Sequence, residues 1–238
     1  MRLYFDTETI PDQSPGAIER IAATIEPPGS MKKPETILAW ETNEKPAKIE
    51  EVYRRTALSG TTGELVSLAW AIEDGDILSV QREPKDSERD MIREFYSELA
   101  KLVQLRHRTT GIVWVGHNVR DFDLRFLFQR SVILGIQPPV SLPHNVAPGS
   151  EAIFDTMTAW AGFRNTIPLE TLCQALGIRG KGGIDGSKVW DYVKAGRIDE
   201  VAEYCRDDVY RVRELYKRLT FTGLTSEGSV DDDLNAVA

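Results

Sequence analysis

Hydrophobic residues fall along the chain in short runs and helical stripes that predict a sheet covered by helices. Short apolar or aromatic runs bounded by turn residues predict strands at 2–5, 64–72, 76–82 and 111–118. The two middle runs are separated by "EDG", which is typical of a hairpin. We therefore expect the first three strands to be antiparallel.

Apolar residues spaced three and four apart predict helices at 91–103, 121–135, 167–178 and 198–220. The order is strand, hairpin, helix, strand, helix. Because such an order places helices against a sheet, it predicts an α/β fold. We expect a mixed β-sheet, with three antiparallel strands followed by parallel strands, flanked by α-helices.

Residues 11–63 differ in character from the rest of the chain. Six prolines interrupt this segment, and only 48–58 has a helical pattern. We interpret it as an insertion in one domain that spans residues 1–220. Residues 221–238 form an acidic tail with a composition typical of disordered segments.

Composition fits an ordinary globular protein, because hydrophobic residues make up 41% and charged residues 28% of the 238 positions. Cys173 and Cys205 are too few for a disulfide framework, and no Cys/His group has zinc-finger spacing. The longest apolar run, 65–72, is far shorter than the ~18 residues that a membrane span needs, and no leader is recognisable. We therefore expect a cytoplasmic protein with no membrane partner.

Two carboxylates stand one residue apart in "FDTET" (5–9), where the first apolar run ends. If the strand continues, Asp6 and Glu8 point to the same side of it. Two like charges that close repel one another unless a cation lies between them. The alternative is a pair of solvated carboxylates at the end of a strand.

A third carboxylate falls on the apolar stripe of the last predicted helix. At ~100° per residue, Tyr204 and Asp208 share the side of the helix that carries Val201 and Val212, whereas Asp207 points to solvent. A buried carboxylate needs a partner, because an unpaired one costs several kcal/mol or becomes protonated. That partner is either a metal ion or, alternatively, an arginine.

Asp123 lies in the first turn of the helix predicted at 121–135, where a carboxylate is favoured by the helix dipole even without a chemical role. The predicted sheet could bring this residue to the same edge as Asp6, Glu8 and Asp208. Four carboxylates without His or Cys suit Mg²⁺ or Mn²⁺ rather than zinc. Bound cations would also offset the net charge of −8, which otherwise disfavours a nucleic-acid partner.

Three segments in order resemble the motifs of one nuclease family. They are "FDTET" (5–9), "NVRDFD" (118–123) and "YCRDD" (204–208). The chain resembles DEDDy-type 3'-5' exonucleases of the DnaQ-like, ribonuclease H-like superfamily. It is especially similar to predicted exonucleases related to the proofreading domain of family B DNA polymerases, including the "GKGGIDGS" loop at 180–187.

This resemblance covers roughly residues 1–220 and implies a ribonuclease H-like fold without a polymerase domain in the same chain. It implies two divalent cations, Mg²⁺ or Mn²⁺, with Asp6 bridging both, Glu8 and Asp208 completing one site and Asp123 serving the other. Tyr204 would orient the attacking water. The residues implied in nucleic-acid binding are Thr7, Asn118, Phe122 and Lys181.

The implied activity is a two-metal-ion hydrolysis that releases nucleoside monophosphates from the 3' end of single-stranded DNA. Two alternatives stay open. An exoribonuclease could use the same fold, because nothing in the sequence decides how a 2'-hydroxyl is treated. A nucleic-acid-binding module without catalysis is the other, although it would be expected to lack some of the acidic residues. No protein partner is predicted.

The predicted orientation of Asp207 and Asp208 on the last helix generates a test. Asp208→Ala should abolish hydrolysis of single-stranded DNA, whereas Asp207→Ala should leave it nearly intact, because only Asp208 lies on the apolar stripe. The measurement is shortening of a 5'-labelled strand by each purified variant. Equal losses of activity in the two variants would show that the predicted orientation of these residues on the helix is wrong.

Overall fold

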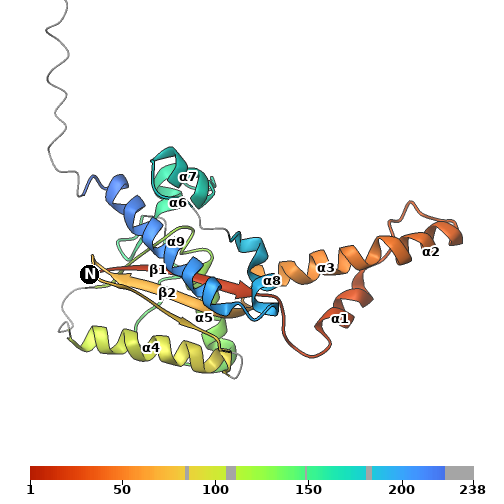
Figure 1. Cartoon of the computed structure of the whole chain (residues 1–238), viewed down its shortest axis with the longest axis horizontal. Coiled ribbons are helices and arrows are strands. Elements are labelled where there is room, and N and C mark those ends of the chain that lie inside the picture. Colours follow the sequence, from red (N-terminus) through yellow and green to blue (C-terminus); the bar gives the residue numbers. More distant parts are fainter. Residues whose placement is uncertain (84–85, 106–110, 148, 181–183, 223–238) are drawn as a thin grey trace, which may run out of the picture.

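A mixed sheet of five strands forms the centre of the computed structural model, which describes residues 1–83, 86–105, 111–147, 149–180 and 184–222 (Figure 1). The strands are β1 (Arg2–Ile10), β2 (Glu64–Ile72), β3 (Ile77–Gln81), β4 (Val113–Gly116) and β5 (Ile153–Asp155). Their order is β3-β2-β1-β4-β5. β1, β2 and β3 are antiparallel, and β4 and β5 are parallel to β1, which confirms the predicted α/β fold.

Helices cover both faces of the sheet (Figure 1). They are α1 (Ala17–Thr24), α2 (Pro34–Asn43), α3 (Lys45–Arg55), α4 (Glu88–Leu105), α5 (Asp123–Leu134), α6 (Thr156–Ala161), α7 (Leu169–Ala175), α8 (Val189–Lys194) and α9 (Ile198–Leu219), with short 3₁₀ turns at Thr56–Leu58 and Gly186–Lys188. Among the described residues, no helix combines the length and the apolar character needed to cross a membrane.

The two faces of the sheet are packed by side chains of different size. Ala69 and Ala71 of β2 let α9 approach one face closely, with Val209 and Val212 buried against them. On the other face, α4 packs through aromatic rings, and Phe95 stacks on Phe5 of β1 with ring centroids 5.5 Å apart. Because both faces are covered, β1 is the buried central strand.

β1 extends well past its parallel neighbour. β4 pairs only with residues 2–4 and ends at Gly116, so one edge of β1 beyond Tyr4 has no strand beside it. A Cβ on Gly116 would lie 2.5 Å from Cβ of Val119 and 3.0 Å from the carbonyl oxygen of Phe5. The missing side chain therefore lets the chain turn sharply from β4 toward α5, directly beside the free edge of β1.

Several predicted boundaries needed correction. The first strand continues to Ile10, and the short strand β5 and the helices α6 and α8 were not predicted. Residues 11–63 hold three helices: α3 corresponds to the helix expected at 48–58, whereas α1 and α2 were not predicted. Pro34 and Pro46 stand in the first turns of α2 and α3, where proline starts a helix rather than interrupting it. The predicted tail lies outside the described residues from residue 223 onward.

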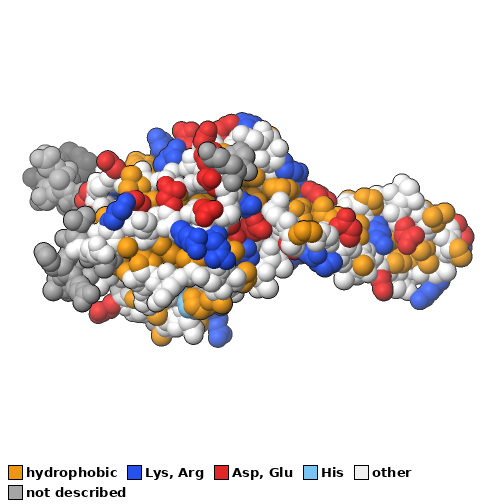
Figure 2. Space-filling view, turned by 90° about the horizontal axis from the view of Figure 1, so that it is seen from below, with side chains coloured by type: hydrophobic (Ala, Val, Ile, Leu, Met, Phe, Trp, Pro, Cys, Tyr) orange, Lys and Arg blue, Asp and Glu red, His pale blue; other side chains and the backbone are white. Residues whose placement is uncertain are grey.

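Residues 11–63, hereafter the arm, project away from the sheet (Figure 1). Hydrophobic, acidic and basic side chains are interspersed along the projection (Figure 2). The arm is attached to α8 near its base. The guanidinium of Arg54 donates two hydrogen bonds to Asp191, of 2.6 and 3.0 Å, and the ring of Tyr53 lies edge-on to Trp190.

A buried ion pair fixes the point where the arm returns to the sheet. Arg130 of α5 donates to both carboxylate oxygens of Glu88 at 2.9 and 2.6 Å, and also to the carbonyl oxygen of Gly60 at 3.2 Å. Glu88 in turn accepts a hydrogen bond from the backbone N–H of Leu65. One ion pair thus joins α4, α5, β2 and the end of the arm.

This pair generates a prediction about stability. Glu88→Ala should lower the free energy of unfolding by about 3–5 kcal/mol, because it leaves the buried guanidinium of Arg130 without its carboxylate. Urea denaturation measures the change. Glu51→Ala, which removes one partner of the exposed Lys48–Glu51 pair, is the control and should leave the urea midpoint nearly unchanged. A loss in Glu88→Ala as small as in the control would refute a structural role for the pair.

Candidate active site

Asp6 and Glu8 lie on the face of β1 that α9 covers. Residues two apart on a strand share a face, and Cys205 of α9 packs against them. The thiol of Cys205 donates to Oδ2 of Asp6 at 3.4 Å and lies 3.5 Å from its carbonyl oxygen. One ligand atom from each of Asp6, Glu8 and Cys205 lies within 4.8 Å of the others. The two carboxylates therefore meet in a narrow space.

Asp123 reaches this region from the opposite side of the sheet. Its Oδ1 accepts hydrogen bonds from the backbone N–H of Thr7 at 3.0 Å and from the Thr7 hydroxyl at 2.8 Å. That N–H lies on the free edge of β1, where a side chain replaces the missing strand as acceptor. Asp123 is 3% exposed and starts α5. The overhang of β1 therefore brings residues from both faces to one place.

α9 contributes Tyr204 and Asp208, which are 7% and 6% exposed. Asp208 forms an ion pair with Arg211, one turn further along α9 and almost fully buried. Arg211 also lies 3.3 Å from Oε2 of Glu170. An arginine partner for Asp208, which the sequence left open as an alternative, is therefore present in the structure.

The neighbouring Asp207 faces the other way. Its side chain is 31% exposed and pairs with Arg179 at 2.8 Å. The acidic pair in "YCRDD" is thus divided between the interior of the protein and its surface.

Burial raises the pKa of Asp6 well above its usual value, and the negative charges of Asp208, Asp123 and Glu8 raise it further. Burial also raises the pKa of Asp123 to about 7, against the opposing effect of its hydrogen bonds from Thr7. The four carboxylates are therefore close enough to repel one another. Hard divalent cations prefer oxygen donors of this kind and would remove the repulsion, so the residues present fit such ions.

Tyr204 lies beside these carboxylates as a neutral hydrogen-bond donor. Burial raises the pKa of its phenol, and the charges of Glu8 and Asp208 raise it further, so the hydroxyl keeps its proton at neutral pH. A Cβ added to Gly186 would lie 3.8 Å from the Tyr204 hydroxyl oxygen, which places the 3₁₀ turn after the glycine-rich loop close to it. Tyr204 is thus suited to donating a hydrogen bond rather than to accepting a proton.

The residues predicted to bind nucleic acid have separate locations. Thr7 and Phe122 line a cavity of about 430 Å³ next to Glu8. Asn118 does not line this cavity. It adopts a left-handed backbone conformation with φ +62°, and its N–H donates to Asp155 at 3.0 Å. Lys181 lies outside the described residues.

Sequence reasoning missed Cys205, Arg211 and Asp155. Arg211 follows Asp208 by three residues, a spacing at which opposite charges on a helix meet, so its pairing could have been anticipated. Cys205 follows Tyr204 directly and was considered only for disulfides and zinc. Asp155 ends β5 and caps α6 by accepting from the N–H groups of Met157 and Thr158. The strand that carries it is only three residues long, which left no recognisable pattern.

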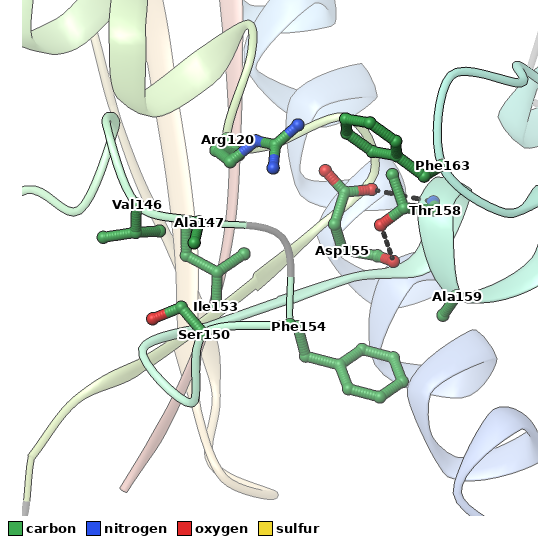
Figure 3. Close-up of a pocket in the computed structure, with 11 residues that line it drawn as sticks. Arg120, Val146, Ala147, Ser150, Ile153, Phe154, Asp155, Thr158, Ala159 and Phe163 are labelled. Carbon is green, nitrogen blue, oxygen red and sulfur yellow. Dashed lines mark hydrogen bonds between the residues drawn. The ribbon is translucent and has the colours of Figure 1, made fainter.

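A second cavity of about 290 Å³ lies beside Asp155. Figure 3 shows Arg120, Asp155 and Phe163 at one end of it and Val146, Ala147 and Ile153 at the other. Arg120 is paired with Asp121 at 2.7 Å. None of the four carboxylates discussed above lines this cavity, which separates it from the candidate active site.

Comparison with known proteins identifies relatives of the chain. Residues 64–237 match a family described as predicted 3'-5' exonucleases related to the exonuclease domain of PolB. Asp123, Tyr204 and Asp208 lie inside this range, whereas Asp6 and Glu8 precede it. No curated protein matches the chain.

The fold is similar to that of a solved family B DNA polymerase from the hyperthermophilic archaeon Pyrobaculum calidifontis. The two structures superpose with a TM-score of 0.55 at 20% sequence identity. The similarity covers 92% of this chain and 24% of the polymerase chain. At this identity the likeness concerns the fold alone, a mixed ribonuclease H-like sheet flanked by helices.

The pKa of Asp123 generates a prediction about stability and pH. Its value in the folded protein, about 7, lies above the ordinary 3.8, so Asp123 favours folding while protonated and loses this contribution as the pH rises through 7. In EDTA, the melting temperature should fall between about pH 4 and pH 7, and Asp123→Asn should flatten that fall. Thermal unfolding across this range measures both proteins. If the melting temperatures of the wild type and Asp123→Asn change with pH in parallel, Asp123 does not have the raised pKa.

Proposed function

The chain belongs to the family of predicted 3'-5' exonucleases related to the exonuclease domain of PolB, and on that basis we propose that it removes nucleoside monophosphates from the 3' end of single-stranded DNA. The reaction would depend on divalent metal ions and use Asp6, Glu8, Asp123, Tyr204 and Asp208.

The observation that carries this proposal is the mutual repulsion of the carboxylates at β1. Three other carboxylates act on Asp6, although burial alone already disfavours its charge. A group of purely structural carboxylates would be expected to avoid such an arrangement, because it destabilises the folded protein at neutral pH. Carboxylates that bind cations for catalysis can be retained in spite of this destabilisation, because the bound cations remove the repulsion.

Asp6, Glu8 and Asp208 would hold one Mg²⁺ or Mn²⁺ ion, and Asp6 and Asp123 a second. When bound, such ions supply Lewis acidity and positive charge next to a phosphodiester. Thr7 keeps Asp123 oriented through its two hydrogen bonds. Arg211 binds one carboxylate oxygen of Asp208 and so restrains the orientation of that carboxylate.

Tyr204 would orient the attacking water or a phosphate oxygen by donating its hydroxyl hydrogen. Its raised pKa supports this role and argues against general-base catalysis, because a phenol that stays protonated cannot accept a proton. Proton removal from the water therefore falls to other groups in the site.

Incubation of a 5'-labelled single strand tests the proposal directly. With Mg²⁺ or Mn²⁺ the strand should shorten one nucleotide at a time and release nucleoside monophosphates, and with EDTA it should stay intact, because the carboxylates then hold no cation. Shortening that persists in EDTA would rule out metal dependence. An RNA strand of the same sequence, digested in parallel, determines whether the enzyme acts on RNA.

A second experiment tests the role of Tyr204. Tyr204→Phe should lower the turnover number by ~10²-fold with little change in melting temperature, because it removes only the hydroxyl that orients the reactants. Tyr210→Phe on the same helix is the control, since Tyr210 packs against Arg179 and lies away from the carboxylates. Comparable rates for Tyr204→Phe and the wild type would exclude a catalytic hydroxyl.

A further inference from the structure

The cavity beside Glu8 is built partly by the arm. It is lined by Thr7, Glu8, Thr9, Pro11, Arg54, Arg55, Ala57, Leu58, Phe122, Gly186, Ser187 and Trp190. Its volume of about 430 Å³ falls within the ~300–1,000 Å³ of small-molecule sites. One wall comes from the end of α3 and the turn after it, and another from Phe122 and Trp190. The arm therefore takes part in forming the candidate active site.

The wall formed by the arm is held in a defined position. Arg54 reaches Asp191 of α8 through two hydrogen bonds and also pairs with Glu50 at 2.7 Å. Paired hydrogen bonds of this kind fix orientation as well as distance. Tyr53 supports the same junction by packing edge-on against Trp190. Arg54 thus serves to attach the wall rather than to bind a ligand.

Arg55, the next residue, differs from Arg54 in its surroundings. It lines the cavity and is exposed, and no hydrogen bond or ion pair joins its guanidinium to another residue in the described part of the chain. Leu58, which is 66% exposed, lines the same cavity. A cation and an exposed apolar side chain beside two aromatic residues match the phosphate and the base of a nucleotide.

We infer that the arm forms the outer wall of the cleft for the single strand and that Arg55 binds one of the strand's phosphates. Leu58, Phe122 and Trp190 contact the base of the terminal nucleotide. This inference rests on the proposed function, since it takes the strand's 3' end to lie at the carboxylates. It gives the arm, which precedes the range matched by the family, a role in substrate binding.

Binding and its salt dependence test the role of Arg55. The probe is a fluorescently labelled single strand whose last linkages are phosphorothioates, which resist hydrolysis, and fluorescence anisotropy in Mg²⁺ gives its affinity. Arg55→Ala should weaken binding about tenfold at low salt. It should also reduce the slope of log K against log salt by ~0.7, the value for one phosphate contact on a single strand.

Lys48→Ala is the matched control, because it removes one positive charge from the same helix at a residue that pairs with Glu51 and does not line the cavity. Arg55→Lys should keep the salt slope of the wild type, since it keeps the charge. If Arg55→Ala lowers the melting temperature, Arg55→Gln replaces it, because glutamine keeps most of the aliphatic stem and a polar end but carries no charge. If the variant without the charge, Arg55→Ala or Arg55→Gln, has the same salt slope as Lys48→Ala, the inference is overturned.

Hydrolysis of an ordinary strand separates the two proposals. If the wild type binds the strand through Arg55 but never shortens it, only the proposed function is refuted. A wild type that shortens the strand, with Arg55→Ala behaving like Lys48→Ala in binding, refutes the role of Arg55 alone.

Discussion

Repulsion between buried carboxylates is the constraint on which the site depends. Asp6 is partly buried beside Asp208, Asp123 and Glu8, and the negative charge of each of them makes the ionised form of Asp6 less favourable. The surrounding structure tolerates this because other contacts hold the elements together: Arg211 neutralises part of the charge on Asp208, and two hydrogen bonds from Thr7 hold Asp123. The fold thus stabilises a group of residues that is unfavourable by itself.

The unequal lengths of two neighbouring strands make this grouping possible. β4 ends at Gly116, whereas β1 continues for several residues, and α5 begins in the space beside the overhang. If β4 were as long as β1, its backbone would accept the hydrogen bond from the N–H of Thr7. Asp123 could then not bind at that edge. α9 closes the other face through small residues of β2. Residues distant in the sequence therefore meet without a long loop to connect them.

Much of this arrangement could be predicted from the sequence, but not all of it. Periodicity located the hairpin and α9, because long regular elements leave a clear pattern. It failed for β5, whose three residues are too few, and for α2, because Pro34 was taken as an interruption. It located α3 at 48–58 but missed its first turn, because Pro46 was taken as an interruption too. The carboxylates could be named from their motifs. The residues that form the wall of the cavity could not be predicted, because that wall depends on how the arm contacts α8 in three dimensions.

The ion pair between Arg130 and Glu88 has a consequence for how such an arm can vary in length. Arg130 of α5 binds the carbonyl oxygen of Gly60, and Arg54 binds Asp191, so the C-terminal part of the arm is fixed to α5 and to α8. The tip of the arm, where α2 lies (Figure 1), carries no comparable attachment among the described contacts. Residues could therefore be added or lost at the tip with little effect on the cleft, whereas a change of even one residue at the base would misalign the wall.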